Sequence, residues 1–350
     1  MNQETVQQLL TQIRRDTGGA FVSGLAYIGD RLGLFAAVAR HGPVDSVALA
    51  AATDLNERYV REWLKALAAF SYIEYDDATK KYAMSEEQRA VLADESSAVF
   101  GAGTFHFTLP SLLRTEQLME VFRNGGGIAY DELHPEVPAS IDRMHRAWFD
   151  YLLTEEWLPA IPDISDRLRQ GIRVLDVGCG LGRSTIAMAR AHPSSSVLGV
   201  DPHPPSIEFA RALAIESGIA NAEFLARPLG NIEPDLRFEL TIAIDCIHDM
   251  ADPIGVLRTI RKHLTDDGLL VWSEPAGSVN PLENRDTLSR MRAALSPFHC
   301  LTVSLAAGGP GLGTLIGTEG AQELAAAAGY ERFETLPVPC ETQLFFGLRR

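Results

Sequence analysis

The segment GIRVLDVGCGLGRSTIAMARAHPSSSVLGVD, residues 171–201, decides the fold of this chain. An apolar strand runs into three alternate glycines, Gly178, Gly180 and Gly182, a helix follows, and a second apolar strand ends in Asp201. Glycine lets the backbone turn sharply and lets a ligand approach the peptide groups, while the first turn of a helix presents free N–H groups. The segment therefore predicts a parallel α/β sheet with a ligand site at the turn.

Two acidic residues indicate which ligand this turn binds. Asp176 lies two residues before Gly178, where a carboxylate suits an amino-acid ammonium group, usually through water, better than a pyrophosphate. The spacing is GxGxG rather than the GxGxxG of dinucleotide sites. Asp201 ends the second strand, where an acid accepts hydrogen bonds from both ribose hydroxyls. The pattern predicts a site for S-adenosylmethionine (SAM), formed by Asp176, Gly178, Cys179, Gly180, Gly182, Ser184, Asp201, Pro202, Asp245 and Cys246.

The rest of the second half continues this alternation of apolar strands and amphipathic helices. Further strands are predicted in AEFLARPLG (222–230), RFELTIAIDCI (237–247), DGLLVWSEP (267–275) and ERFETLPVPCETQLFFGLRR (331–350), the last of which contains two. The chain has 350 residues, a length that suggests two domains. We predict a Rossmann-like, seven-stranded α/β sheet domain over 171–350.

The first half has helices and one small hairpin. Residues 21–40 predict a helix, and Asp45 and Asn56 are positioned to cap two more. A strand, a turn and a second strand follow over 71–84. Because three helices followed by a hairpin make a winged helix, we predict a mostly helical winged-helix domain over 1–98.

Residues 99–170 are predicted to form a helical connector that covers a substrate pocket. Aromatic side chains just before a catalytic domain are well placed to roof an apolar pocket, although most such residues belong to a core. The candidate pocket residues are Phe105, Met144, Trp148, Phe149 and Tyr151.

The charge of the chain argues against nucleic acid as a partner. The net charge is −15, and residues 1–98 carry 10 Lys and Arg against 14 Asp and Glu. A winged helix that reads duplex DNA needs a clear basic face. We therefore expect the N-terminal domain to form a homodimer, with no nucleic-acid partner. A SAM-responsive DNA-binding regulator is the alternative from another functional class.

The cysteines and the apolar runs predict a cytoplasmic protein. The four cysteines are far apart without a CxxC pair, which disfavours a disulfide scaffold or a zinc knuckle. The N-terminus has no apolar signal region, and no apolar run approaches the length of a membrane span. We expect no membrane partner.

The segments VLDVGCGLG, VLGVDPHP and FELTIAIDCIHDMADPIGVLRTIRKHLTDDGLLVWSEP resemble the class I SAM-dependent methyltransferases. With the winged helix included, residues 20–350 resemble the small-molecule O-methyltransferases of bacteria and plants. This resemblance implies methyl transfer from SAM to a small organic acceptor, with S-adenosylhomocysteine as product. It also implies an N-terminal domain that dimerises and a last strand that is antiparallel. The motifs specify the cofactor and leave the acceptor, and the choice between O-, N- and C-methylation, open.

Four residues form the predicted catalytic group: His248, Asp249, Glu274 and His299. His248 follows the fourth strand, at the edge of the sheet where α/β folds bind ligands. It resembles the HDW-motif histidine that acts as general base in plant O-methyltransferases. A hydroxyl must lose its proton as it attacks the methyl group, and imidazole has a suitable pKa. A positioning role for His248 is an equal alternative, and Asp249 could orient it.

A metal-dependent reaction is the other alternative. The α-keto acid C-methyltransferases resemble this chain in their two-domain plan and hold a metal with two histidines. His248 and His299 have a similar separation, and Glu274 could be a third ligand or a base. Imidazole suits Zn or Fe, and an open coordination position could enolise a keto acid.

Overall fold

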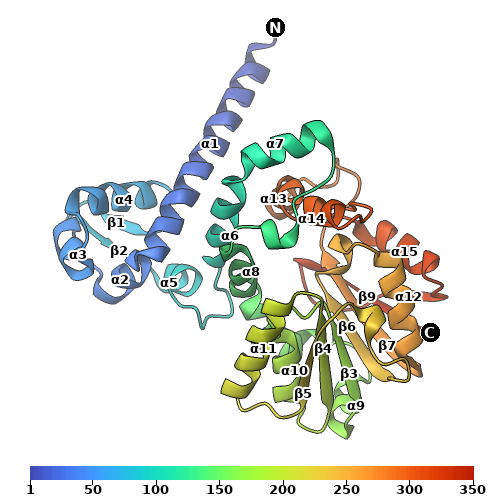
Figure 1. Ribbon diagram of the computed structural model, residues 1–350. Helices are drawn as coiled ribbons and strands as arrows, with labels where there is room; N and C mark the ends of the chain where they lie inside the picture. The colour runs from blue at the N-terminus through green and yellow to red at the C-terminus, as the bar shows by residue number, and fades with distance from the viewer. The chain divides into compact units, whose positions relative to one another are not determined.

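The computed structural model describes all 350 residues, which form two compact units (Figure 1). The first unit contains Met1–Leu113 and His134–Ala147, and the second contains Arg114–Leu133 and Trp148–Arg350. The residues predicted as a connector, 99–170, are therefore divided between both units. No single helix is both long and apolar enough to cross a bilayer; α1 and α2 meet that test only as a pair bent by 71°.

The first unit is mostly helical and contains the predicted winged helix. Its helices are α1 (Gln3–Arg31), α2 (Leu34–His41), α3 (Ser46–Thr53), α4 (Glu57–Ala69), α5 (Glu86–Leu92), α6 (Gly103–Leu112) and α8 (Glu136–Ala147). Its two strands, β1 (Glu74–Asp76) and β2 (Lys81–Ala83), pair antiparallel. Helices α2 to α4 and this hairpin confirm the predicted order of elements.

A glycine divides the helix that the sequence predicts over 21–40. Gly33 has a φ of 70°, a left-handed conformation that ends α1 and lets α2 begin in a new direction. The caps predicted at Asp45 and Asn56 are both present. Each side chain accepts a hydrogen bond, of 2.8 and 3.0 Å respectively, from a backbone N–H in the first turn of its helix.

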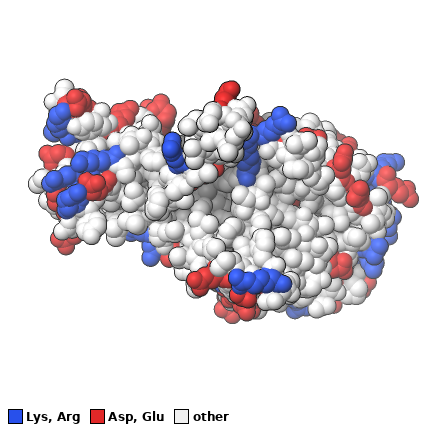
Figure 2. Space-filling view, turned by 90° about the horizontal axis from the view of Figure 1, so that it is seen from above, with Lys and Arg blue, Asp and Glu red and all other residues white.

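The basic residues of α4 are all paired with acidic neighbours. Arg58 lies 2.6 Å from Glu62, Arg61 lies 2.6 Å from Glu57, and Lys65 lies 3.5 Å from Glu62. Figure 2 likewise shows basic and acidic side chains interspersed on the visible face, without a continuous basic stripe. This charge pattern does not favour the DNA-binding alternative.

The second unit contains the predicted seven-stranded sheet. Its strands are β3 (Arg173–Val177), β4 (Ser196–Asp201), β5 (Ala222–Ala226), β6 (Phe238–Ile244), β7 (Leu264–Pro275), β8 (Arg332–Thr335) and β9 (Gln343–Arg349). They lie in the order β5-β4-β3-β6-β7-β9-β8, and the last strand, β9, is antiparallel to both of its neighbours. The sheet and its antiparallel last strand are as predicted.

The remaining helices belong to the second unit, and most of them connect or cover its strands. They are α7 (Thr115–Asn124), η1 (Tyr130–Glu132), the π-helix η2 (Trp148–Trp157), α9 (Ile164–Gln170), α10 (Arg183–Ala191), α11 (Pro204–Glu216), η3 (Leu229–Asn231), η4 (Ile247–Asp249), α12 (Pro253–His263), α13 (Thr287–Leu295), η5 (Ser296–Phe298), α14 (Cys300–Ala306) and α15 (Gly317–Ala327).

Helices cover both faces of the sheet, as a mostly parallel sheet requires (Figure 1). Leu175 of β3 packs in one apolar layer with residues of α12 and α15. Its neighbour Val174 packs in the opposite layer with residues of α9, α10 and η2. The carboxyl ends of β3, β4, β6 and β7 are left as the edge at which their following loops gather, and that edge is where such sheets bind ligands.

Candidate functional site

The glycine loop after β3, residues 178–182, has backbone that borders open space at Gly180. Gly178, Gly180 and Gly182 have φ values of 71°, 51° and 81°, a region that favours glycine. A Cβ on Gly182 would lie 2.6 Å from the Cβ of Ala210, so packing also requires glycine there. A Cβ on Gly180 would meet no atom within 4 Å. This part of the loop can therefore lie directly against a ligand.

Asp176 lies beneath the loop and ties β3 to α10. Its Oδ2 accepts hydrogen bonds of 2.6 Å from Ser184 Oγ and from Thr185 Oγ1, in the first turn of that helix. The side chain is buried, and burial raises the pKa of Asp176 to about 6 against the opposing effect of the two hydroxyls. Asp176 and Ser184 thus support the loop from below, and any contact of Asp176 with a ligand ammonium would be indirect.

Asp201, the last residue of β4, accepts a hydrogen bond from the glycine loop. Its Oδ2 accepts a 3.0 Å hydrogen bond from Gly180 N–H, and its Oδ1 accepts a 2.9 Å bond from His203 N–H. Burial raises the pKa of Asp201. Since each carboxylate oxygen can accept a second hydrogen bond, both oxygens remain able to receive a ribose hydroxyl. Pro202, the next residue, is exposed.

Two cysteines pack around the loop. Cys246 Sγ donates to the carbonyl of Val177 over 3.3 Å, and a Cβ on Gly178 would lie 2.9 Å from this sulfur. Cys179 is buried. Burial raises the pKa of both thiols well above its ordinary value, so both are protonated near neutral pH. They shape the loop as small packing residues.

His248 and Glu274 form a buried pair where β6 and β7 end. His248 Nδ1–H donates to Glu274 Oε2 over 2.5 Å, and Trp272 Nε1–H donates to Glu274 Oε1 over 2.7 Å. Only 2% of His248 and 0% of Glu274 are exposed. The indole fixes the carboxylate, the carboxylate fixes the ring through Nδ1, and the Cys300 thiol is a further hydrogen-bond partner of the ring.

The charge of this pair is coupled to further acidic groups. Burial alone lowers the pKa of His248, but the charges of Glu274 and Cys300 outweigh it and hold that pKa well above its ordinary value. Burial raises the pKa of Asp249 to about 7, while the charge of His248 acts in the opposite direction. Carboxylates thus outnumber cations around the pair, and such surroundings favour a cationic ligand.

The residues grouped in space differ from the predicted metal pair. Potential ligand atoms of Asp245, His248 and Glu274 lie within 4.8 Å of one another, and His299 is not among them. His299 instead lies before α14, with its ring 6.3 Å from that of Tyr130. Glu274 and His248 already satisfy each other by hydrogen bonding. The arrangement does not favour the metal alternative.

Tyr130 belongs to this site, although the sequence analysis did not identify it. Its ring packs edge-on against His203 and His299, with centroids 5.3 and 6.3 Å apart. Burial raises the pKa of Tyr130, and the charges of Asp201 and Asp249 raise it further. Its phenol is therefore a neutral group close to both Asp201 and Asp249. Tyr130 precedes the sheet in the chain, and no local pattern marks it.

The segment that carries Tyr130 is fixed to α14. Thr302 Oγ1 accepts a 2.7 Å hydrogen bond from the buried N–H of Ile128. Gly127 lies against the carbonyl of Thr302 so closely that no Cβ fits between them. These two contacts hold the segment over the carboxyl edge of the sheet.

The aromatic residues predicted to line a pocket lie in both units. Phe105 packs edge-on against a tyrosine of the winged helix, with ring centroids 5.9 Å apart, and Met144 lies on α8. Trp148 and Phe149 pack against the apolar layer on one face of the sheet, and Tyr151 is 37% exposed. Their contact with a substrate remains a prediction.

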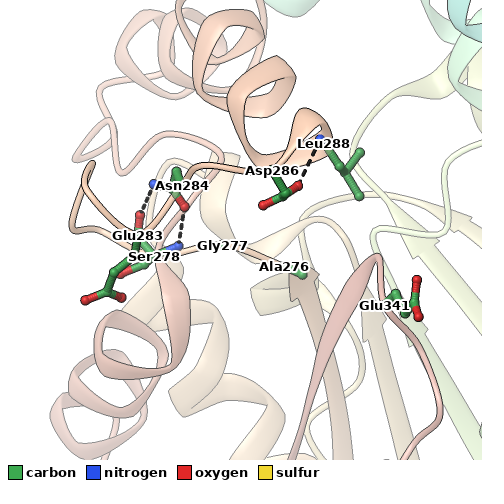
Figure 3. Close-up of a pocket in the computed structure, with 8 residues that line it drawn as sticks. All are labelled: Ala276, Gly277, Ser278, Glu283, Asn284, Asp286, Leu288 and Glu341. Carbon is green, nitrogen blue, oxygen red and sulfur yellow. Dashed lines mark hydrogen bonds between the residues drawn. The ribbon is translucent and has the colours of Figure 1, made fainter.

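A separate pocket of about 310 Å³ opens beside the end of β7 (Figure 3). It is lined by Ala276, Gly277, Ser278, Glu283, Asn284, Asp286, Leu288 and Glu341. Asn284 Oδ1 accepts a 2.9 Å hydrogen bond from Ser278 N–H, and Asp286 Oδ1 accepts one of 2.9 Å from Leu288 N–H. The first bond shapes the loop and the second caps α13, so two of its polar side chains support local structure.

Two family models match the chain. Residues 168–303 match a model described as a methyltransferase domain, and residues 20–94 match one described as an Rv2258c-like winged HTH domain. These matches confirm the methyltransferase and winged-helix combination that the motifs indicated.

Similar proteins include methyltransferases of several kinds. The ubiquinone biosynthesis O-methyltransferase of Cereibacter sphaeroides (strain ATCC 17025 / ATH 2.4.3) is 31% identical over 140 residues, which are 38% of this chain and 53% of that protein. This chain thus spans about half the length of that curated relative. A crystal structure of a putative O-methyltransferase from Nostoc punctiforme has a TM-score of 0.77 at 18% identity, covering 97% of this chain and 98% of that one. Human N-acetylserotonin methyltransferase in complex with SAM has a TM-score of 0.73 at 15% identity, covering 98% of both chains. The structural matches show that the fold extends over nearly the whole chain.

Proposed function

Because residues 168–303 belong to the methyltransferase domain family, we propose that this protein transfers the methyl group of SAM to a small organic acceptor. The observation that carries the proposal is the loop at Gly180, where open space borders the backbone and Asp201 lies within hydrogen-bonding distance. We further propose that the transfer is an O-methylation with His248 as general base or positioning residue.

The residues around the loop fit SAM chemically. SAM supplies an electrophilic methyl group on a positively charged sulfonium. Asp201 would hold the ribose hydroxyls, and Gly178, Gly180 and Gly182 let the backbone approach the cofactor. Asp176 and Asp249 add two buried carboxyl groups, whose negative charge would stabilise a ligand that carries sulfonium and ammonium charges.

His248 Nε2 is the atom proposed to receive the acceptor proton. The hydrogen bond of Nδ1 to Glu274 fixes the orientation of the ring. The charge of Glu274 favours the imidazolium that proton transfer produces. A cation bound nearby acts in the opposite direction, because like charges disfavour protonation, and it therefore favours the neutral, basic imidazole. General-base catalysis contributes about 10²- to 10⁴-fold to such a reaction.

Cofactor binding is tested with Asp201→Asn. Asparagine keeps the shape but loses the charge and one acceptor, so SAM affinity should fall about 100-fold, since hydrogen bonds to charged groups contribute about 1.5–3 kcal/mol each. Isothermal titration with SAM measures the change. Asp235→Asn, an exposed acid of the same unit, is the matched control and should bind normally. Normal SAM affinity in Asp201→Asn would reject the ribose assignment.

The role of His248 is tested with His248→Ala. Tritiated SAM and a panel of phenols and catechols first identify an acceptor that the wild-type protein methylates. The variant should then lose about 100-fold or more in kcat while SAM affinity changes little. Turnover close to that of the wild type would show that His248 is not the base.

We also propose that the N-terminal helices form a homodimer. Several large apolar residues of α1 are exposed, among them Leu9 at 57%, Ile13 at 61% and Phe21 at 74%. A second copy of this chain could bury them. Light scattering on the eluted protein should give twice the chain mass, and Ile13→Asp should shift it to the monomer. A monomeric wild-type protein would refute this proposal.

A further inference from the structure

Arg292 is a buried cation without a carboxylate partner. It lies on α13, is 7% exposed, and donates through Nη1 to the carbonyl of Ala276 over 3.2 Å. That bond uses one of the five N–H donors of a guanidinium. Burial lowers the pKa of Arg292, although the nearby charge of Asp245 acts in the opposite direction. Burying a cation without an ion pair is unfavourable, so an anion that binds to Arg292 would stabilise the buried guanidinium.

Gln343 provides a second unsatisfied group at the same edge of the sheet. It is 2% exposed, and its Oε1 accepts a 3.1 Å hydrogen bond from Ser273 Oγ, while its Nε2 has no partner. One end of this buried amide therefore lacks a hydrogen bond whichever way the amide is turned. A buried polar group without a partner indicates a missing ligand atom or strain.

Both groups are connected to the buried histidine pair. Ala276, which accepts the Arg292 bond, donates its own N–H to the carbonyl of Thr342 over 3.1 Å, next to Gln343. Cys300 lies close enough to His248 and to Arg292 to affect the pKa of each. Arg292, the unpaired Nε2 of Gln343 and His248 are thus parts of one polar region at the carboxyl end of β7.

We infer that Arg292 and Gln343 bind a carboxylate group of the methyl acceptor. This inference rests on the proposed methyl transfer at His248, and it defines the acceptor as a small monoanionic acid. A guanidinium matches a planar carboxylate with two parallel N–H bonds, and a neighbouring amide N–H can donate to the same group.

The carboxylates around His248 disfavour more than one negative charge on the acceptor. Asp245, Asp249 and Glu274 lie around His248 and would repel a phosphate dianion more strongly than a carboxylate. A neutral acceptor would leave Arg292 unpaired. Trp148, Phe149 and Cys340 pack against one apolar layer of the sheet, and Cys340 lies three residues before Gln343 in the chain.

The experiment compares benzoate with benzamide, which has nearly the same shape and no charge. The full chain is loaded with S-adenosylhomocysteine and titrated calorimetrically with each compound and with inorganic phosphate. Benzoate should bind at least about tenfold more tightly than benzamide, the factor expected for a charge-assisted hydrogen bond, and phosphate should bind more weakly than benzoate. Equal binding of the two aromatic compounds, preferred phosphate binding, or no benzoate binding would overturn the inference.

Variants locate the effect on Arg292. Arg292→Gln should remove the preference for benzoate, and Arg292→Lys should restore part of it by returning the charge. Arg290→Gln, an exposed arginine on the same helix, is the matched control and should keep the preference. If Arg292→Gln does not fold, Gln343→Glu tests the same site, because a new carboxylate there should weaken benzoate binding at least about tenfold. Unchanged benzoate binding in Arg292→Gln or in Gln343→Glu would refute the assignment.

The outcomes separate this inference from the proposed function. S-adenosylhomocysteine affinity is measured in the same samples, and the benzoate preference is measured whether or not that ligand binds. Cofactor binding without a benzoate preference would refute only the carboxylate subsite. Absence of cofactor binding would refute the methyltransferase proposal itself.

Discussion

Replacing Gly182 by alanine should mainly lower stability, whereas replacing Gly180 by alanine should mainly weaken SAM binding. Both residues have positive φ, so either alanine incurs about 1–2 kcal/mol of backbone strain. At Gly182 the new Cβ would also lie 2.6 Å from Ala210 Cβ and 2.8 Å from Phe224 Cε1. Such overpacking adds about 1–3 kcal/mol, so Gly182→Ala should lose about 2–5 kcal/mol of unfolding free energy. This loss is a large part of the unfolding free energy of a typical domain, which is about 5–15 kcal/mol.

At Gly180 the added methyl group meets open space rather than protein. Gly180→Ala should therefore lose only the strain energy, while its Cβ occupies the space in which the cofactor would contact the loop. A steric cost of about 1–3 kcal/mol in the complex corresponds to a loss of SAM affinity of roughly 5- to 150-fold.

Urea unfolding followed by circular dichroism measures the stability of each variant, and isothermal titration with SAM measures binding. We expect Gly182→Ala to have the lower unfolding midpoint and Gly180→Ala to have the weaker SAM affinity, in comparison with the wild type. Equal destabilisation of both variants, or wild-type SAM affinity in Gly180→Ala, would refute the assignment of the open side of the loop to the cofactor.

Three further perturbations test other contacts. If His248 is the base, activity should rise with pH through its raised pKa, and Glu274→Gln should move that limb of the kcat profile to lower pH, because the charge that raises the pKa is removed; a limb that does not move would contradict the role of the pair. Thr302→Val leaves the buried N–H of Ile128 without an acceptor and should cost about 1–3 kcal/mol in urea unfolding, whereas unchanged stability would show that this bond is dispensable. Burial raises the pKa of Asp30, but its hydrogen bonds to His106 and Arg143 and the charges of these two residues outweigh burial and lower the pKa overall. The stabilisation from this network is therefore present above the pKa of unfolded aspartate and is lost as the pH falls through the lower folded value. Asp30→Asn should therefore flatten the decline of the unfolding midpoint in acid, and an unchanged pH dependence would argue against that network.

The sequence determined the parts of the fold that depend on short-range pattern. The strand, the three glycines and the helix after β3 form because their residue types restrict the backbone over a few positions. The same is true of the winged helix, whose caps at Asp45 and Asn56 are visible in the sequence. The division of the predicted 21–40 helix at Gly33 was missed, because a single glycine inside a helical pattern does not by itself reveal a turn.

Only the tertiary structure decided which distant residues meet. It joined His248 to Glu274 rather than to His299, because β6 and β7 are neighbours in the sheet while His299 lies beyond α13. It brought Tyr130 to the site through the contacts of its segment with α14, and it left Arg292 buried with a single carbonyl partner. The physical reason is that burial, charge pairing and packing depend on neighbours in space, whereas turns, caps and periodicity depend on neighbours in the chain.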